Sequence, residues 1–205
     1  MALVKYNNNS ISAVTSAASF PAGAMTLIKT ITASSDSTIS FVDGSSDVVL
    51  DSTYPIYLFK FINIHPASNN TELTFNASVD GGSNYNVTKT TTFFQAEHDE
   101  ADSTTSLAYK TGDDIAQGTG FQNLCDTIGN DNDASGNGFL HLFDPSNTTF
   151  VKHFISTIQM ISDQNYSYNA FIAGYGNTTS AIDAIRFKMS SGNIDSGTFK
   201  LYGVS

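Results

Sequence analysis

Short runs of alternating hydrophobic and polar residues recur along most of this chain, separated by polar or glycine-containing breaks. A period of two places apolar side chains on one face of a β-strand, and β-branched and aromatic residues dominate these runs. The pattern therefore predicts an all-β protein. The predicted strands are 25–32, 38–42, 54–64, 72–78, 85–95, 104–110, 138–143, 150–162, 166–175, 184–189 and 197–204.

The last two predicted strands show this alternation most clearly. Along both, apolar residues alternate with cationic or phenolic ones, and a polar stretch, 190–196, separates them. The apolar positions are Ile185, Phe187, Met189, Phe199 and Leu201. We therefore predict that 184–189 and 197–204 form an antiparallel hairpin with one apolar face.

Two other segments have a distinct local character. Residues 80–84, Asp-Gly-Gly-Ser-Asn, tolerate positive φ and predict a turn between two strands. The segment 113–128 has apolar residues at mixed spacings and is interrupted by Gly118 and Gly120. It predicts at most a short turn of helix at 121–125.

The first 25 residues are rich in small and polar side chains and cannot form a core by themselves. We expect residues 1–25 to be an extended N-terminal arm, which either docks on a neighbouring subunit or is a flexible terminus. Residues 26–205 are expected to form one antiparallel β-sandwich domain of the jelly-roll kind, because many short strands occur without helices to cover a parallel sheet.

The charge of the chain argues against nucleic-acid binding. Charged residues make up only 14% of the chain, the net charge is −10, and the only arginine is Arg186. Nucleic-acid binding needs clustered Lys and Arg, so we expect no nucleic-acid partner. The first residues lack the charged and apolar segments of a signal peptide, and no apolar run is long enough for membrane insertion. We expect synthesis in the cytoplasm without export.

Four groups of residues are candidates for chemistry, and each has a simpler structural interpretation. His98, Asp99 and Glu100 with nearby Asp102 could supply a base and its orienting carboxylate, but adjacent strand residues point to opposite faces and no nucleophile is evident. An acidic patch is favoured there. The lone Cys125 excludes a disulfide within the chain and lacks a nucleophile motif, so a buried apolar role is expected.

The loop 131–136, Asp-Asn-Asp-Ala-Ser-Gly, begins like a calcium-binding loop. Its twelfth position is Leu142 where an EF-hand requires Glu, so a turn stabilised by Asx side chains is favoured over an ion site. His65, His141 and His153 are dispersed, with His141 expected on the face opposite Phe139 and Phe143. We predict no catalytic residue, no metal and no cofactor.

Most aromatic residues lie at alternating strand positions and are expected in the core. Tyr166 with Tyr168, and Tyr175 with Asn177, could instead stack on sugar rings or on a neighbouring subunit. Core or subunit packing is the favoured interpretation.

The chain from Thr74 to its end resembles small structural proteins of marine tailed phages that infect cyanobacteria and SAR11-type bacteria. The C-terminal block 188–204, which contains Ser-Ser-Gly-Asn-Ile and Phe-Lys-Leu-Tyr-Gly, is its most specific part. The other segments that carry the resemblance are 79–88, 95–101, 138–143 and 172–175. The resemblance implies a virion component and no catalytic residue.

We therefore expect an accessory protein on the outside of a tailed-phage virion, most simply a capsid decoration or cement protein. It would self-associate, with three copies expected, and bind major capsid or tail proteins. The alternative is a tail-fibre or receptor-binding protein that recognises host surface glycans. An enzyme such as a depolymerase would need paired carboxylates in a groove, and the sequence identifies no such pair.

Overall fold

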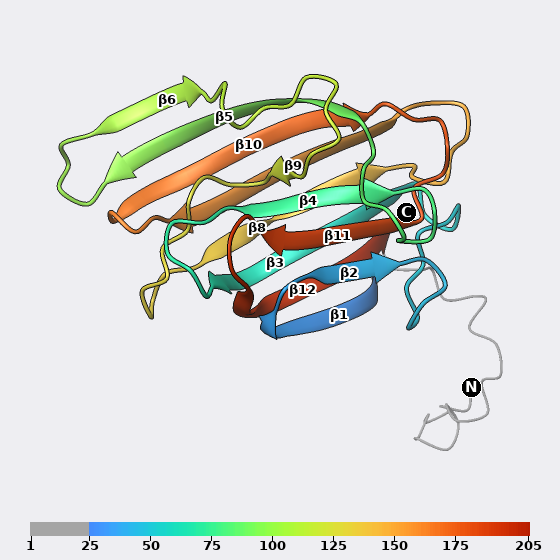
Figure 1. The fold of residues 1–205 in the computed structure, drawn as a ribbon, viewed down its shortest axis with the longest axis horizontal. Coiled ribbons are helices and arrows are strands. Elements are labelled where there is room, and N and C mark those ends of the chain that lie inside the picture. The colour runs from blue at the N-terminus through green and yellow to red at the C-terminus, as the bar shows by residue number, and fades with distance from the viewer. Residues whose placement is uncertain (1–24) are drawn as a thin grey trace, which may run out of the picture.

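A computed structural model describes residues 25–205, which form twelve strands and no helix (Figure 1). The strands are β1 (Met25–Asp36), β2 (Ile39–Val42), β3 (Ile56–Pro66), β4 (Leu73–Ser78), β5 (Lys89–Asp99), β6 (Thr105–Tyr109), β7 (Gln122–Asn123), β8 (Gly136–Phe143), β9 (Lys152–Ile161), β10 (Tyr166–Gly176), β11 (Ala184–Met189) and β12 (Ile194–Val204).

The strands form two antiparallel sheets of unequal size that pack face to face (Figure 1). The larger has eight strands in the order β1-β12-β3-β8-β9-β10-β5-β6, and the smaller has four in the order β2-β11-β4-β7. The predicted all-β class and antiparallel β-sandwich are confirmed, while the jelly-roll form stays a prediction. The predicted N-terminal arm lies outside the described residues, apart from Met25, which begins β1.

Aromatic side chains fill the space between the sheets. Phe187 of β11 is fully buried at the centre of this cluster and packs against five other phenylalanine rings with centroid distances of 5.1 to 6.5 Å. Those rings belong to Phe41, Phe59, Phe61, Phe75 and Phe199, and so come from both sheets. Their edge-to-face and tilted arrangements are those that aromatic pairs prefer.

The predicted C-terminal hairpin is wrong, although both of its strands exist. Strand β11 pairs with β2 and β4 in the small sheet, whereas β12 pairs with β1 and β3 in the large sheet. The segment 190–193 therefore connects the two layers. The apolar faces of these strands meet across the core, where the rings of Phe187 and Phe199 lie 5.6 Å apart.

Two other predicted elements differ from the structure. The expected turn of helix at 121–125 is absent, because Gln122 and Asn123 pair with β4 as the short strand β7. The strand predicted at 85–95 begins four residues later, at Lys89. Tyr85 instead lies in the connection from β4, where its ring covers the Arg186 guanidinium at 3.8 Å. The predicted turn at 80–84 is present, with positive φ at Gly81 and Gly82.

Candidate interaction surface

The outer side of five neighbouring strands of the large sheet carries no acidic residue, lysine or arginine. Strand register aligns β8, β9, β10, β5 and β6 so that alternate residues share this side. We call this surface the uncharged face. Its residues are Asn137, Phe139, His141, Phe143, His153, Ile155, Thr157, Gln159, Ile161, Ser167, Asn169, Phe171, Ala173, Tyr175, Thr90, Thr92, Phe94, Ala96, His98, Thr105, Leu107 and Tyr109.

Large apolar side chains on the uncharged face remain accessible to solvent. Leu107 is 72% exposed, Tyr109 50%, Ile155 48% and Phe94 42%. The Phe94 and Phe171 rings stack at 5.0 Å with an interplanar angle of 12°. Exposed apolar side chains that gather on one uncharged face often mark an interaction site.

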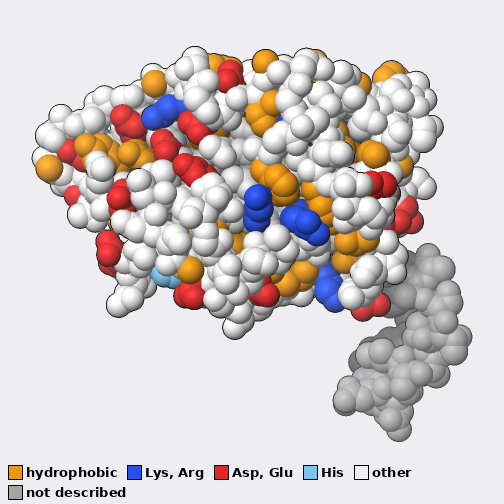
Figure 2. Space-filling view, viewed as in Figure 1, with side chains coloured by type: hydrophobic (Ala, Val, Ile, Leu, Met, Phe, Trp, Pro, Cys, Tyr) orange, Lys and Arg blue, Asp and Glu red, His pale blue; other side chains and the backbone are white. Residues whose placement is uncertain are grey.

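The opposite side of the molecule differs in charge. Figure 2 views the side that carries the small sheet, and charged side chains are scattered over it. Arg186 and Lys188 of β11 lie there, each over an aromatic ring: Arg186 over Tyr85 and Lys188 over Phe121, the latter at 4.6 Å. The apolar character of the uncharged face is therefore a local property of one side of the sandwich.

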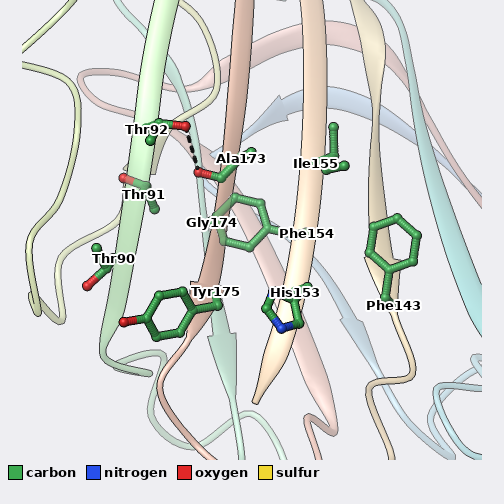
Figure 3. Close-up of a pocket in the computed structure, with 10 residues that line it drawn as sticks. All are labelled: Thr90, Thr91, Thr92, Phe143, His153, Phe154, Ile155, Ala173, Gly174 and Tyr175. Atoms are coloured by element: carbon green, nitrogen blue, oxygen red, sulfur yellow. Dashed lines mark hydrogen bonds between the residues drawn. The ribbon is translucent and has the colours of Figure 1, made fainter. Parts of the chain in front are cut away.

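A hollow of about 380 Å³ lies in the uncharged face (Figure 3). The side chains of Tyr175 and His153 lie side by side along it, with Phe143 and Ile155 on the far side. The small residues Ala173 and Gly174 of β10 form part of its lining. A Cβ at Gly174 would lie 2.7 Å from the Thr90 carbonyl oxygen, so this position requires glycine.

Polar groups at the rim of the hollow are bonded to one another. Asn177 donates through Nδ2 to Gln117 Oε1 at 2.9 Å. Gln117 Nε2 donates to Thr90 Oγ1 at 2.7 Å and to the Tyr175 hydroxyl at 3.4 Å. Tyr175 and Asn177, the candidate pair for stacking on a sugar or on a neighbouring subunit, are thus linked through Gln117, whose amide donors are already used within the protein.

The other predicted aromatic pair lies away from this face. Tyr166 and Tyr168 have ring centroids 5.6 Å apart, and Tyr168 packs against the hydrophobic core. Burial raises the pKa of the Tyr168 hydroxyl, with smaller contributions from the negative charges of Asp126 and Glu97. Core packing, the favoured interpretation, is confirmed for Tyr168.

The acidic cluster at 98–102 forms the turn between β5 and β6. Asp99 is 8% exposed, and its carboxylate accepts hydrogen bonds from the hydroxyl and backbone N–H of Ser103 and from the N–H of Thr104. These bonds lower the pKa of Asp99. His98 Nε2 lies 3.3 Å from Asp102 Oδ1 at the surface. The Asp99 carboxylate therefore stabilises the turn between β5 and β6, and its role in this cluster is structural.

The predicted position of His141 is wrong, because alternate strand residues share one face. The imidazole lies between Phe139 and Phe143, with ring centroids 5.1 and 6.2 Å away, and all three are on the uncharged face. Burial lowers the pKa of His141.

At the far end of β3, His65 Nδ1 lies 2.8 Å from the Ala134 carbonyl oxygen. Within residues 25–205, no three His, Cys, Asp or Glu side chains converge as metal ligands.

The calcium-like loop forms a backbone turn in which the Ala134 N–H donates to the Asp131 carbonyl oxygen at 2.8 Å.

Cys125 is fully buried, and its sulfur accepts a hydrogen bond from the Leu73 N–H at 3.1 Å. Burial raises the pKa of this thiol. Its expected role as a small buried residue is confirmed.

No protein-family model, curated protein or solved structure matches this chain. In the part of the chain described here, no helix has the length and apolar character needed to cross a membrane. The interpretation of the uncharged face therefore depends on its own geometry. The sequence analysis named Tyr175 of this face as a candidate for stacking on a neighbouring subunit but did not define the face itself, although alternation such as Phe139-x-His141-x-Phe143 carries its signal.

Proposed function

We propose that this chain is a non-enzymatic accessory protein on the outside of a tailed-phage virion, and that it decorates or cements the capsid. It acts by self-association, with three copies as the expected number, and by docking on major capsid or tail proteins. The observation that carries the proposal is the uncharged face, since a broad sheet surface without charged residues and with exposed apolar side chains serves protein contact better than chemistry.

The sequence supports the viral context of this proposal. The C-terminal block that resembles marine-phage structural proteins spans β12 and the connection before it. β12 pairs with β1 and β3, so this block is an integral part of the large sheet. A Ser-, Thr- and Asn-rich surface with few charged residues is also common among virion β proteins.

Copy number on purified virions tests this proposal. We expect the protein to be present in numbers comparable with the major capsid protein, because a decoration protein binds a repeated capsid site. Quantitative mass spectrometry of separated capsids and tails measures this ratio. A few copies per particle, confined to tails, would favour the tail-fibre alternative, and absence from the particle would contradict both.

The alternative, a receptor-binding protein for host surface glycans, draws support from the open hollow and its aromatic side chain Tyr175. Under the decoration proposal we expect no binding on a glycan array. Binding that is lost in Tyr175→Ala and kept in Tyr202→Ala, an aromatic residue of β12, would replace decoration with receptor recognition.

A further inference from the structure

We infer that the uncharged face is covered by a second copy of this chain. This inference rests on the self-association in the proposed function and names the surface at which two copies meet. Because both copies use the same face, this contact closes as a pair, and a third copy would need a different surface. The sandwich interior already buries one side of the large sheet, so the uncharged face is an additional apolar surface. Its exposed residues Leu107, Tyr109, Ile155 and Phe94 come from three strands, β5, β6 and β9, and gain most from removal from water.

Charge favours a second copy as the partner. The chain carries a net charge of −10, and two copies repel each other over most possible approaches. None of the 22 positions of the uncharged face is acidic or basic apart from its three histidines, His98, His141 and His153. Two copies that meet through this face keep most of their acidic residues outside the contact, where water screens them. The two carboxylates that touch the face are Asp102 beside His98 and Asp114 bonded to the Tyr109 hydroxyl, near the β6 edge.

The dimensions of the face match those of a stable interface. Five strands at about 4.8 Å spacing are roughly 24 Å wide, and eight residues at about 3.4 Å are roughly 27 Å long. The face therefore covers roughly 650 Å² on each copy, or roughly 1,300 Å² for two, which falls in the range of specific protein interfaces.

The hollow and its rim favour protein over carbohydrate. A sugar requires free hydrogen-bond donors and acceptors, whereas both amide N–H groups of Gln117 and one of Asn177 are already bonded within the chain. The side chains of Phe143, Ile155 and Tyr175 instead line the hollow with carbon atoms. An apolar side chain of the second copy fits this lining, because it leaves no polar group unpaired.

The molar mass of the purified full-length protein in solution tests the inference. The wild type is expected to have a mass of at least twice 21.9 kDa in size-exclusion chromatography with light scattering. Ile155→Glu and Leu107→Glu each bring a charge into the interface, so each should weaken association by at least about 100-fold and give the 21.9 kDa species.

The matched control is Val79→Glu, which adds the same charge at an exposed apolar residue beyond β4, outside the uncharged face. It should keep the wild-type mass. Circular dichroism and thermal unfolding of each variant separate lost association from misfolding, and both substituted side chains on the uncharged face point to solvent in the single chain.

A wild-type protein that is monomeric at 100 µM, or an oligomer that persists in both Ile155→Glu and Leu107→Glu, would overturn the inference. A monomer whose uncharged face binds glycans would assign the face to a carbohydrate instead. Virion incorporation is measured separately: a monomer found at high copy number on capsids overturns the interface alone, and an oligomer absent from virions overturns the proposed function alone.

Discussion

Replacing Phe187 with alanine is expected to lower the free energy of unfolding by about 3–5 kcal/mol, the usual cost of truncating a buried phenylalanine. Phe187 is fully buried and contacts phenylalanine rings from both sheets. The substitution therefore leaves a cavity between the layers and removes five aromatic pairings at once. Equilibrium unfolding in guanidinium chloride measures the loss.

Phe150→Ala is the matched control, because it removes the same ring from a position that is 68% exposed. Its free energy of unfolding should stay within about 0.5 kcal/mol of the wild type. If Phe187→Ala lost less than about 1 kcal/mol, the core would have collapsed around the missing ring, and Phe187 would not join the two sheets as described.

Strand positions could be predicted from the sequence because one face of most strands lies against the core. In β9, for example, Phe154, Ile158 and Met160 are buried while His153 and Ile155 are exposed. This difference imposes the period of two that the sequence shows. Boundaries were less accurate where a loop residue is also buried, as with Val87, which precedes β5.

Strand pairing could not be predicted at the C-terminus, because alternation gives the face of a strand and leaves its partner open. Strands β11 and β12 both direct phenylalanine inward, and that pattern suits a hairpin within one sheet as well as two strands in opposite sheets. The course of the connection between β11 and β12 decides between these two arrangements. In the structure, β11 pairs with β4 and β12 pairs with β3, and both partner strands are distant in sequence.

The candidate surface was missed for a related reason. On the uncharged face, Phe171 and Tyr175 of β10 look like core residues in the sequence, because their strand is apolar on both sides. Only the sheet order shows that β8, β9, β10, β5 and β6 are adjacent and align their uncharged positions into one surface. Strands β8, β9 and β10 are consecutive in the sequence, as are β5 and β6, and the pairing of β10 with β5 joins the two groups across residues distant in sequence.

Lys89 is a second source of a large effect, because it carries an ammonium group into the interior. The side chain is 2% exposed, and Nζ donates one hydrogen bond, to the Gly120 carbonyl oxygen at 2.7 Å. Among residues 25–205, no carboxylate forms an ion pair with it. Burial lowers the pKa of Lys89 to about 8.

The low pKa of Lys89 makes the free energy of unfolding increase with pH in the alkaline range. Between pH 8 and 10.5 the unfolded chain holds a proton on Lys89 that the folded chain has released, so unfolding takes up a proton and becomes less favourable as pH rises. The folded state should therefore gain about 2–3 kcal/mol from pH 7.5 to pH 10 relative to Lys89→Met. Urea unfolding of both proteins across this range measures the difference.

The comparison between the two proteins isolates Lys89 from other groups that titrate at alkaline pH. Burial, aided by the negative charge of Asp51, raises the pKa of Tyr57 and lowers stability above pH 10 in both proteins alike. Lys200→Met, which removes one positive charge from β12 of the same sheet, controls for the change in net charge. Parallel pH curves for the wild type and Lys89→Met would show that Lys89 is hydrated in solution, and that the Gly120 carbonyl is not its principal partner.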